Sequence, residues 1–368
     1  MNKKPKISVL VPCYNVEKFL VQCMDSIVNQ TLRDIEIICI NDGSTDSTLD
    51  ILKSYADKDK RVLIIDKPNE GYGKSMNRGL DKATGKYIGI VESDDWIDAD
   101  MFENLVAAAD ENDVDVVKSN FYEYTTTDGE KNILNDIVPV HEAGRVIEPR
   151  LENGILWAPP SIWAAIYNRE FLIKNNIRFL ESPGASFQDT GFNFKVWLMA
   201  NRAYLTTNAY LHYRCDNVNS SVKSTAKVFC VCDEWDEIER YIAQEQPQMY
   251  EGTRRLISVI KWGTYEWNLD RLCGDVRRDF QERFTREYEA HIRAGHFTRA
   301  LFDDREWARR LCVIYPKSVL VRLQRVFFNL IRPIYRTDII GGKKYFRLFK
   351  KINIRSPKNM PSLEVVVR

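Results

Sequence analysis

Five carboxylate side chains crowd into nine positions of the stretch IVESDDWIDADM, residues 90–101. They are Glu92, Asp94, Asp95, Asp98 and Asp100, and they follow an apolar run typical of a buried strand. Because neighbouring carboxylates repel one another, the crowding predicts a cation among them. Residues i and i+2 of an extended chain point to the same side, so Glu92 and Asp94 can converge on one ligand or on one hard divalent cation, Mn²⁺ or Mg²⁺. Asp98 and Asp100 are expected in the first turn of the next helix, where negative charge is favourable.

Two other polar stretches carry side chains that could bind a nucleotide. NDGSTDST, residues 41–48, is either a helix cap and turn or a place where Asp42 accepts hydrogen bonds from a nucleobase or ribose. NEGYGKSMNRG, residues 69–79, has neither the dinucleotide-binding nor the P-loop glycine spacing. Lys74 or Arg78 could still hold a diphosphate at a helix N-terminus, and a solvated helix face is the alternative.

An alternation of strand and helix patterns over the first 120 residues must position these side chains. Strands are expected at 7–11, 35–40, 61–65, 86–91 and 114–119, and helices at 16–28, 45–56, 73–83 and 98–111. This order predicts an α/β fold with a parallel sheet, in which ligands bind beyond the carboxyl ends of the strands. Loops or a short hairpin are expected at 120–160, a helix beginning near 188, a strand over 203–214, and helix from about 223 to the end.

The motifs together resemble family 2 glycosyltransferases. SVLVPCYNVEKFL, INDGSTDST and IGIVESDDWI cover residues 6–120, and FQDTGFNFK and YRCDNVNSSV extend the resemblance to about residue 222. It implies the GT-A fold, a mixed and mostly parallel sheet flanked by helices, followed here by a helical C-terminal appendage. A Q-x-x-R-W motif and spanning helices, which mark the processive synthases of this family, are absent from the sequence. A single-addition enzyme is therefore expected.

The resemblance also implies roles for individual residues. Asp94 is expected to bind the metal and Asp189 to act as catalytic base. The residues expected to bind the nucleotide sugar are Pro12, Tyr14, Asn15, Asp42, Lys74, Glu92, Ser93, Asp95 and Arg214. Two positions depart from the family pattern, since Glu92 replaces the usual first Asp and Gln188 replaces the acid that commonly precedes the base. A helix N-terminus is expected to keep Asp189 ionised at neutral pH.

These residues predict an inverting, metal-dependent glycosyltransferase that moves one sugar from a nucleotide-diphosphate sugar, a UDP-sugar, to a lipid-linked or surface-glycan acceptor. A sugar-1-phosphate nucleotidyltransferase is the rival enzyme class, and a non-catalytic sugar-binding protein is the third hypothesis. Trp157 and Trp163 are interpreted as core residues, with an acceptor-sugar platform as the alternative. His212 is interpreted as structural.

The overall balance of 53 Lys and Arg against 52 Asp and Glu conceals an asymmetry, because residues 305–368 hold 16 against 3. The segments VLVRLQRVFFNLIRPIYR and KKYFRLFKKINIR interleave basic with apolar residues, which is typical of a segment on an anionic membrane surface. A helical bundle is the alternative, and nucleic-acid binding is not expected. We predict a catalytic domain at 1–222, a helical region at 223–318 and a basic amphipathic tail at 319–368.

Composition predicts a globular protein, with 44% hydrophobic and 29% charged residues. Eight scattered cysteines without a C-x-x-C pair indicate reduced thiols. The N-terminus lacks the apolar length of a signal peptide, and no stretch has the roughly 18 apolar residues of a spanning helix. The expected location is cytoplasmic, peripheral on the inner face of the cytoplasmic membrane.

Overall fold

The structure is a computed structural model that describes residues 4–127, 129–217, 227–316, 318–320, 336–340 and 343–347. The chain divides into two compact units, residues 1–247 and 248–368. The first unit contains every residue that the sequence motifs assign to the site. The predicted boundary after residue 222 falls among residues outside the described ranges and stays a prediction.

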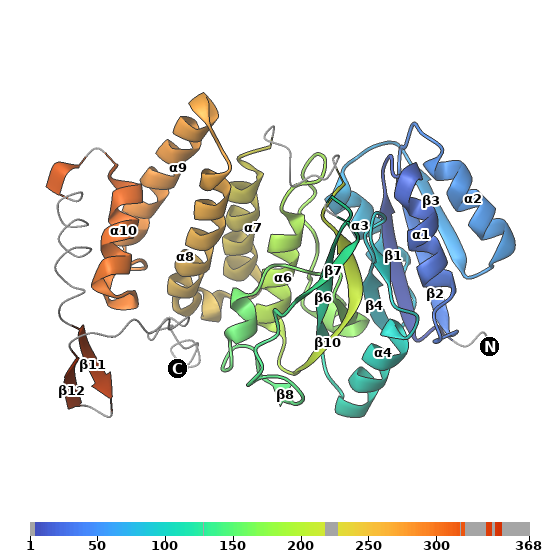
Figure 1. Ribbon diagram of the computed structural model, residues 1–368, viewed down its shortest axis with the longest axis horizontal. Helices are drawn as coiled ribbons and strands as arrows, with labels where there is room; N and C mark the ends of the chain where they lie inside the picture. The colour runs from blue at the N-terminus through green and yellow to red at the C-terminus, as the bar shows by residue number, and fades with distance from the viewer. Residues whose placement is uncertain are drawn as a thin grey trace. The chain divides into compact units, whose positions relative to one another are not determined.

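The first unit is built on one sheet with the strand order β3-β2-β1-β4-β9-β6-β10-β5 (Figure 1). Strands β1 to β4 are parallel, and so are β6 and β10. Strand β9 is inserted antiparallel between β4 and β6. The strands are β1 (Ile7–Cys13), β2 (Ile35–Asp42), β3 (Val62–Lys67), β4 (Tyr87–Ile90), β5 (Trp96–Ile97), β6 (Val116–Thr125), β7 (Lys131–Asn135), β8 (Val146–Ile147), β9 (Ala165–Asn168) and β10 (Ala203–Arg214).

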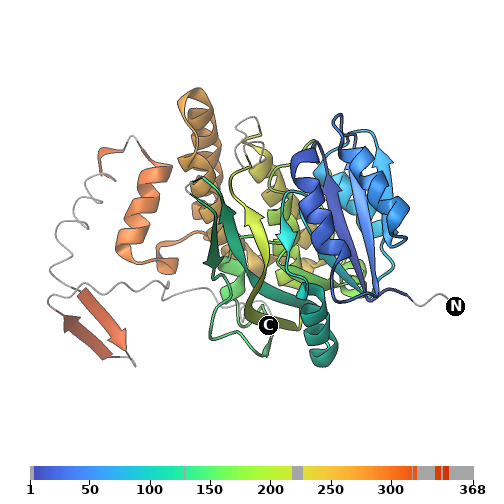
Figure 2. The same ribbon diagram turned by 45° about the vertical axis from the view of Figure 1, so that its right-hand side comes forward.

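Helices cover both faces of this sheet, as the views in Figures 1 and 2 show. Met24 of α1 contacts Cys39 of β2 on one face. Ile40 follows Cys39 in β2, so its side chain points to the opposite face of the sheet. A Cβ on Gly79 of α3 would lie 3.1 Å from the Ile40 side chain, so α3 packs on that opposite face. The helices are α1 (Glu17–Val28), α2 (Thr48–Lys58), α3 (Tyr72–Lys82), α4 (Met101–Asn112), α5 (Arg169–Lys174), α6 (Gln188–Met199) and α7 (Cys230–Glu245).

Continuous burial explains why the first strands form a sheet covered on both sides. All seven residues of β1 are buried, and so are seven of the eight residues of β2. A run of this kind has no polar face to turn to water, which confirms the prediction of a parallel sheet between helices. The predicted hairpin after residue 120 is also confirmed, since β6 pairs antiparallel with β7.

The second unit contains the helices α8 (Pro247–Asp270), α9 (Gly274–Arg293) and α10 (Asp304–Ile314). Its core is aromatic, because Trp262 packs on Phe284, Tyr288 and Phe297 at ring-centroid distances of 4.7, 4.9 and 5.1 Å. The prediction of helix to the end of the chain is wrong at β11 (Arg336–Ile340) and β12 (Lys343–Arg347), which pair antiparallel. Alternating apolar and basic residues suit a strand as well as a helix when the run is short.

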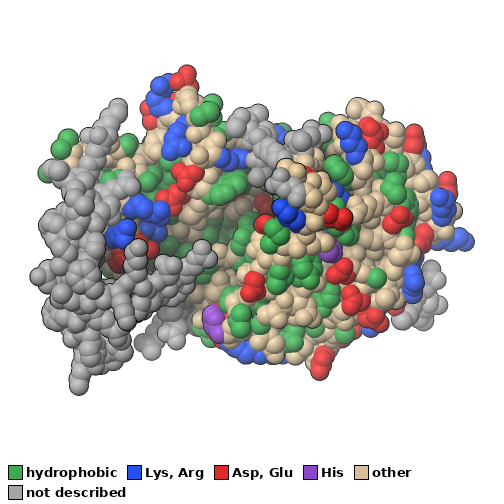
Figure 3. Space-filling view, in the orientation of Figure 1, with side chains coloured by type: hydrophobic (Ala, Val, Ile, Leu, Met, Phe, Trp, Pro, Cys, Tyr) green, Lys and Arg blue, Asp and Glu red, His purple; other side chains and the backbone are tan. Residues whose placement is uncertain are grey.

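Most of the predicted basic tail lies outside the described residues, in the ranges 321–335, 341–342 and 348–368. Within the described part of the chain, no helix is both long and apolar enough to cross a membrane. Asp and Glu side chains are spread among Lys and Arg over the visible face of the first unit, as Figure 3 shows.

Candidate active site

The first three of the crowded acids, Glu92, Asp94 and Asp95, lie in a turn that follows strand β4. Asp95 N donates to Glu92 O at 3.0 Å, which closes a tight turn over residues 92–95. Tyr72 at the start of α3 donates its hydroxyl to Glu92 Oε1 at 2.6 Å. Asn217 Nδ2 donates to Asp94 Oδ2 at 2.7 Å. The predicted metal residue and the predicted ribose residue therefore lie in one turn at the carboxyl end of a parallel strand.

The other two acids of the opening stretch leave this turn. Asp98 Oδ1 lies 3.0 Å from His212 Nε2, and Asp100 precedes helix α4 and is exposed. The His212 ring is stacked on Trp96 and on Tyr122, with centroids 4.8 and 5.1 Å apart. These contacts agree with the structural interpretation of His212.

Arg214 holds the acidic turn in place. Its backbone N–H donates to Asp95 Oδ1 at 2.8 Å, and its Nε donates to Asp94 O at 2.9 Å. The guanidinium lies over the rings of Phe19 and Trp96, 4.8 and 5.0 Å from their centroids. The structure thus brings Arg214 to the predicted site, where its contacts are with the protein; its diphosphate contact stays a prediction.

The residues after β1 and β2 are joined to each other. Asn15 has a positive φ of 52°, and its Oδ1 accepts the Thr45 N–H at 2.8 Å. Its own N–H donates to Ser44 Oγ at 3.0 Å. Tyr14 beside it is 51% exposed, so its ring is available to stack on a base, whereas Pro12 is buried. The two predicted nucleotide-binding loops form one platform.

Asp42 is buried, and its carboxylate is occupied within the protein. Its Oδ1 accepts the Glu70 N–H at 2.8 Å, its Oδ2 accepts the Gly71 N–H at 3.0 Å, and Lys67 forms an ion pair with it. Asp42 therefore shapes the loop before α3. Lys74 pairs with Glu70 at 2.7 Å. The nucleotide contacts of Asp42 and Lys74 stay predictions.

Asp189 lies in the first turn of α6, and the segment before it is docked on the loop before α3. Tyr72 N donates to Gly184 O at 2.9 Å. Both Gly71 and Gly184 have positive φ, and a side chain on Gly71 would come within 2.7 Å of Gly184 N. Phe187, directly before α6, is left-handed with a φ of 63°. Strained backbone of this kind is concentrated at functional sites.

Gln188 organises the turn that leads to the predicted base. Its Oε1 accepts the Ser186 N–H at 2.5 Å, and its Nε2 donates to Ser182 Oγ at 2.8 Å and to Gly184 O at 3.2 Å. An amide can accept and donate at once, which an ionised carboxylate cannot do. The departure at position 188 therefore has a structural reason in this chain.

The pKa shifts show that the acids share one neighbourhood. Burial raises the pKa of Glu92 to about 8, and the charges of Asp94 and Asp189 add to the increase. Burial also raises the pKa of Asp95 well above its usual range. Burial raises the pKa of Asp189 to about 6, against the lowering effect of hydrogen bonds from Thr190. The helix N-terminus therefore does not dominate the pKa of Asp189, although the group is still mainly ionised at pH 7.

Several residues of this site lie in the quoted sequence motifs but were given no role. Tyr72 and Asn217 contact the predicted acids directly, and each comes from a different part of the chain. Tyr213 lies close enough to Asp95 and Asp94 for their charges to raise its pKa. Tyr72 lies at a predicted helix start, and Tyr213 and Asn217 lie in the motif YRCDNVNSSV. The acids that these residues contact are decided only by the assembled fold.

The carboxyl groups fit a cation that the substrate helps to bind. Within the described residues, no group of three or more His, Cys, Asp or Glu side chains is arranged to hold a metal. Asp94 is partly exposed, and the buried Asp95 Oδ2 has no hydrogen-bond partner among the described residues. Mg²⁺ commonly binds one or two carboxylates and completes its shell with water and substrate phosphates. The donor set suits that mode of binding.

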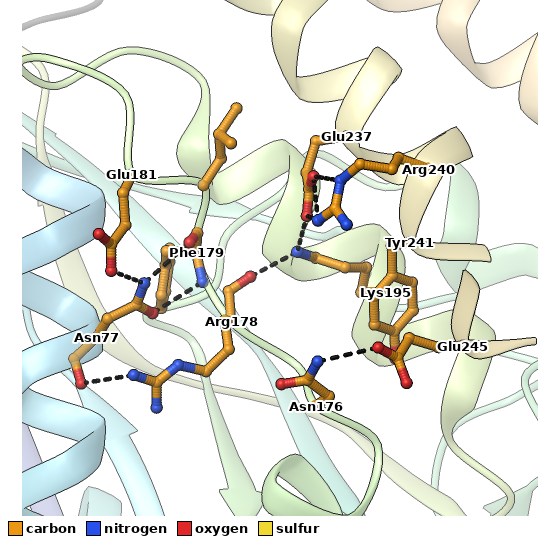
Figure 4. A pocket seen from close by; sticks show the side chains of 11 residues that line it. Asn77, Asn176, Arg178, Phe179, Glu181, Lys195, Glu237, Arg240, Tyr241 and Glu245 are labelled. Carbon is orange, nitrogen blue, oxygen red and sulfur yellow. Dashed lines mark hydrogen bonds and ion pairs between the residues drawn. The ribbon is translucent and has the colours of Figure 1, made fainter. Parts of the chain in front are cut away.

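A cavity of about 300 Å³ lies elsewhere in the first unit (Figure 4). Lys195 in its wall donates to Arg178 O at 2.5 Å and lies 3.6 Å from Glu237, which also pairs with Arg240 at 2.6 Å. Lys195, Glu237 and Arg240 thus form a chain of ion pairs in the wall. None of the predicted catalytic or binding residues lines this cavity.

Residues 8–184 match the family described as Glycosyl transferase family 2. The chain is 34% identical over 225 residues to the "Uncharacterized glycosyltransferase EpsJ" of Bacillus subtilis. The aligned region covers 59% of this chain and 62% of the relative. It is 34% identical over 219 residues to the "Glycosyltransferase GlyG" of Streptococcus pneumoniae, covering 56% of this chain and 70% of the relative. It spans 30% of GlyA of S. pneumoniae and 64% of YibD of Escherichia coli, so coverage of several relatives is below two thirds.

The fold resembles that of S. aureus TarS, residues 1–349, in complex with UDP-GlcNAc. The TM-score is 0.69, with 21% sequence identity, and the likeness covers 94% of this chain and 97% of that one. At this identity the likeness shows the fold alone, and it confirms the predicted GT-A arrangement of a mostly parallel sheet with C-terminal helices.

Proposed function

The chain belongs to glycosyl transferase family 2, and from that premise we propose that it moves one sugar from a UDP-sugar to a glycan or lipid-linked acceptor with inversion at the anomeric carbon. One observation carries the proposal. Glu92 and Asp94 at a strand end and Asp189 at a helix start lie close enough for the charges of Asp94 and Asp189 to raise the pKa of Glu92. A nucleotide-binding edge and a separate carboxylate base are what a single displacement needs.

In the proposed reaction, Asp189 accepts the proton of an acceptor hydroxyl as its oxygen attacks the anomeric carbon. The bond between that carbon and the donor diphosphate breaks as the new glycosidic bond forms, and the nucleotide leaves as UDP. A base with a pKa of about 6 is ionised at neutral pH and still basic enough to take the proton. Asp189 lies outside the 92–95 turn, at the start of helix α6.

Asp94, with Glu92 and Asp95 in the same turn, would hold a divalent cation, Mn²⁺ or Mg²⁺. When bound, the ion would offset the charge of the departing diphosphate. Arg214 holds the backbone of this turn, and Tyr72 orients Glu92, so the protein supplies a shaped acidic turn.

Two facts support a UDP-sugar as donor. The platform formed by Asn15 and residues 44–45 leaves the Tyr14 ring exposed beside it, where a base can stack. TarS, which shares the fold, was solved with UDP-GlcNAc. A sugar-1-phosphate nucleotidyltransferase and a non-catalytic sugar-binding protein, the two other hypotheses, have no comparable support.

The function is tested by incubating the protein with a panel of UDP-sugars and Mn²⁺ and measuring free UDP. We expect UDP release from at least one donor, faster with a glycan acceptor present, and a β-linked product from an α-linked donor. Pyrophosphate release would favour the nucleotidyltransferase instead. Binding without UDP release from any donor would leave the sugar-binding protein. An α-linked product would contradict inversion.

We also propose that the basic tail, residues 319–368, holds the protein on the cytoplasmic face of the membrane. Support comes from its 12 Lys or Arg within a sequence that interleaves basic and apolar residues. Liposomes that contain anionic lipid should sediment the full chain but not a form that ends at residue 318. Both forms should bind UDP. Equal sedimentation of the two forms would contradict the proposal.

A further inference from the structure

Three aromatic rings from separate elements form a stack in the first unit. Trp163, in the loop before β9, lies parallel to Tyr213 of β10, with centroids 5.2 Å apart and an interplanar angle of 6°. Phe121 of β6 meets Trp163 edge-on at 4.6 Å and Tyr213 at 6.4 Å. Phe121 and Trp163 are 4% and 9% exposed, and Tyr213 is only partly buried. Tyr213 is therefore the ring of the stack that a ligand reaches first.

Tyr213 lies beside the catalytic acids. After burial, the charges of Asp95, Asp94 and Asp189 are among the causes that raise the pKa of its phenol. Tyr213 is only partly buried, so a ligand between the two catalytic regions can reach its ring and its hydroxyl. A tyrosine hydroxyl that a ligand covers usually forms a hydrogen bond.

The loop that carries Trp163 is fixed by a buried lysine. Lys118 of β6 is 2% exposed, and its Nζ donates to Ser161 Oγ at 2.7 Å and to Ser161 O. Ser119 N donates to Ala164 O at 2.9 Å, on the other side of the tryptophan. Burial lowers the pKa of Lys118 to about 7, so burying this side chain is costly. The loop is thereby held at both ends of Trp163, which keeps the indole against Tyr213.

We propose that Tyr213, backed by Trp163, is the subsite for a pyranose ring of the acceptor. A pyranose has a face of apolar C–H groups and a rim of hydroxyls. The face of the Tyr213 ring that is turned away from Trp163 would cover the apolar face of the sugar, and the phenol would hydrogen-bond one hydroxyl. A neighbouring hydroxyl would then lie near Asp189, the proposed base. The inference rests on the proposed function, because it names the acceptor class of that same reaction.

Direct binding tests the subsite without turnover. The protein, loaded with UDP and Mn²⁺, is mixed with methyl pyranosides of glucose, galactose, mannose and N-acetylglucosamine, and saturation-transfer NMR records which ring protons receive magnetisation. Wild type should show transfer to the C–H protons of at least one pyranoside. Tyr213→Leu should lose it, and Tyr213→Phe should retain part of it because the ring is kept. No transfer to any pyranoside in wild type would overturn the subsite.

Tyr122→Leu is the matched control. Tyr122 is the next residue of β6 after Phe121, so it points to the opposite face, where it stacks on His212. This variant should bind pyranosides as wild type does. If Tyr122→Leu and Tyr213→Leu lose binding equally while both still bind UDP, a general loosening of β6 and β10 replaces the subsite as explanation.

Kinetics separate this inference from the proposed function. With an accepted donor, Tyr213→Leu should raise the acceptor KM roughly tenfold or more, the size of one lost ring contact. The slow release of UDP to water should stay within about twofold, because water needs no ring platform. Unchanged acceptor KM in Tyr213→Leu would overturn the subsite and leave the proposed function standing. If wild type releases no UDP from any donor, the proposed function fails, while pyranoside binding still decides the subsite.

Discussion

The two sides of the proposed site are built by different means. On the donor side, loops after β1, β2 and β3 are tied by hydrogen bonds of short polar side chains, such as Asn15 to Thr45 at 2.8 Å and Asp42 to Gly71 at 3.0 Å. On the acceptor side, the stack of Phe121, Trp163 and Tyr213 comes from β6, the loop before β9, and β10. The donor side is thus a set of backbone-fixing hydrogen bonds, and the acceptor side is a packed aromatic surface.

This difference predicts which side of the site tolerates amino-acid substitution. A nucleotide diphosphate is one ligand with fixed charges, so loops that present it need exact backbone geometry and short polar side chains. A ring surface recognises shape with little directionality, so it can be re-formed with other aromatic residues. We therefore expect substitutions on the donor side to remove all reactions, and substitutions on the acceptor side to affect transfer while sparing donor binding.

The largest effect is expected for Asp94→Ala, on the donor side. With the proposed metal residue gone, sugar transfer and UDP release to water should both fall below detection, and UDP binding should no longer depend on Mn²⁺. Isothermal titration with and without Mn²⁺ measures the binding. Asp100→Ala is the control, since Asp100 is exposed and outside the turn, and it should keep activity. Metal-dependent UDP binding by Asp94→Ala would refute the assignment.

Asp189→Asn should slow sugar transfer while leaving donor binding intact. Loss of a general base should slow transfer by roughly 10²–10⁴-fold. UDP affinity and thermal stability should hardly change, because the amide can still accept the Thr190 N–H. The control is Asp233→Asn, which alters an exposed acid in the first turn of the next helix, α7, and should leave transfer unchanged. Transfer by Asp189→Asn at the wild-type rate would remove Asp189 from the mechanism.

The acidic limb of the pH profile should follow Asp189. Only the ionised form can accept a proton, and burial raises its pKa to about 6. Below that pH the transfer rate should drop about tenfold per pH unit, and above it this group should no longer limit the rate. The residual activity of Asp189→Asn should lack that limb. A wild-type rate that stays constant from pH 7 to pH 5 would argue against this assignment.

The smallest expected effect is on stability, at a buried acid between α6 and α7. Glu234 of α7 is 1% exposed against Gly191 of α6, and neither carboxyl oxygen has a hydrogen-bond partner among the described residues. Burial raises its pKa to about 9, with Lys195 opposing and the charges of Asp189, Glu237 and Asp233 adding to the shift. The folded chain therefore holds a proton that the unfolded chain releases above its ordinary pKa of 4.5.

This difference makes wild type lose stability as pH rises from about 4.5 to 9, because only the folded state then carries the proton. Glu234→Gln removes the titration, so it should raise the free energy of unfolding by about 1–3 kcal/mol at pH 7 and by less at pH 5. Urea unfolding at both pH values measures it. Glu237→Gln, which breaks ion pairs to Lys195 and Arg240, should lower stability instead. An equal gain at both pH values for Glu234→Gln would contradict the linkage.

Local patterns were enough for the parallel part of the fold and for the polar loops at its carboxyl edge, whose nucleotide contacts stay predictions. The apolar runs that become β1 to β4 are continuous, and each ends in polar residues, so both the sheet and its ligand edge follow from neighbouring residues. The two-residue strands β5 and β8 and the antiparallel direction of β9 could not be predicted. They depend on pairing with distant strands, such as Ile97 with Leu211, and carry too few residues for a pattern.

The acceptor side was the part that the sequence left open. Trp163 was interpreted as a core residue, and its 9% exposure agrees with that interpretation. Its partner Tyr213 belongs to a strand that local patterns identify, but nothing local tells which rings will stack across it. Contacts of this kind join residues far apart in the chain, and only the assembled sheet decides them.

The close approach of Gly71 and Gly184 has a consequence for the order of folding. These glycines lie in two segments that are distant in sequence, and the hydrogen bond from Tyr72 N to Gly184 O at 2.9 Å forms only when both segments are in place. Closing so long a loop is slow compared with forming the early βα units. Asp189 follows directly after the docked segment. On refolding, we therefore expect secondary structure to return first and enzymatic activity to return later, because the contact between the Gly71 and Gly184 segments forms late.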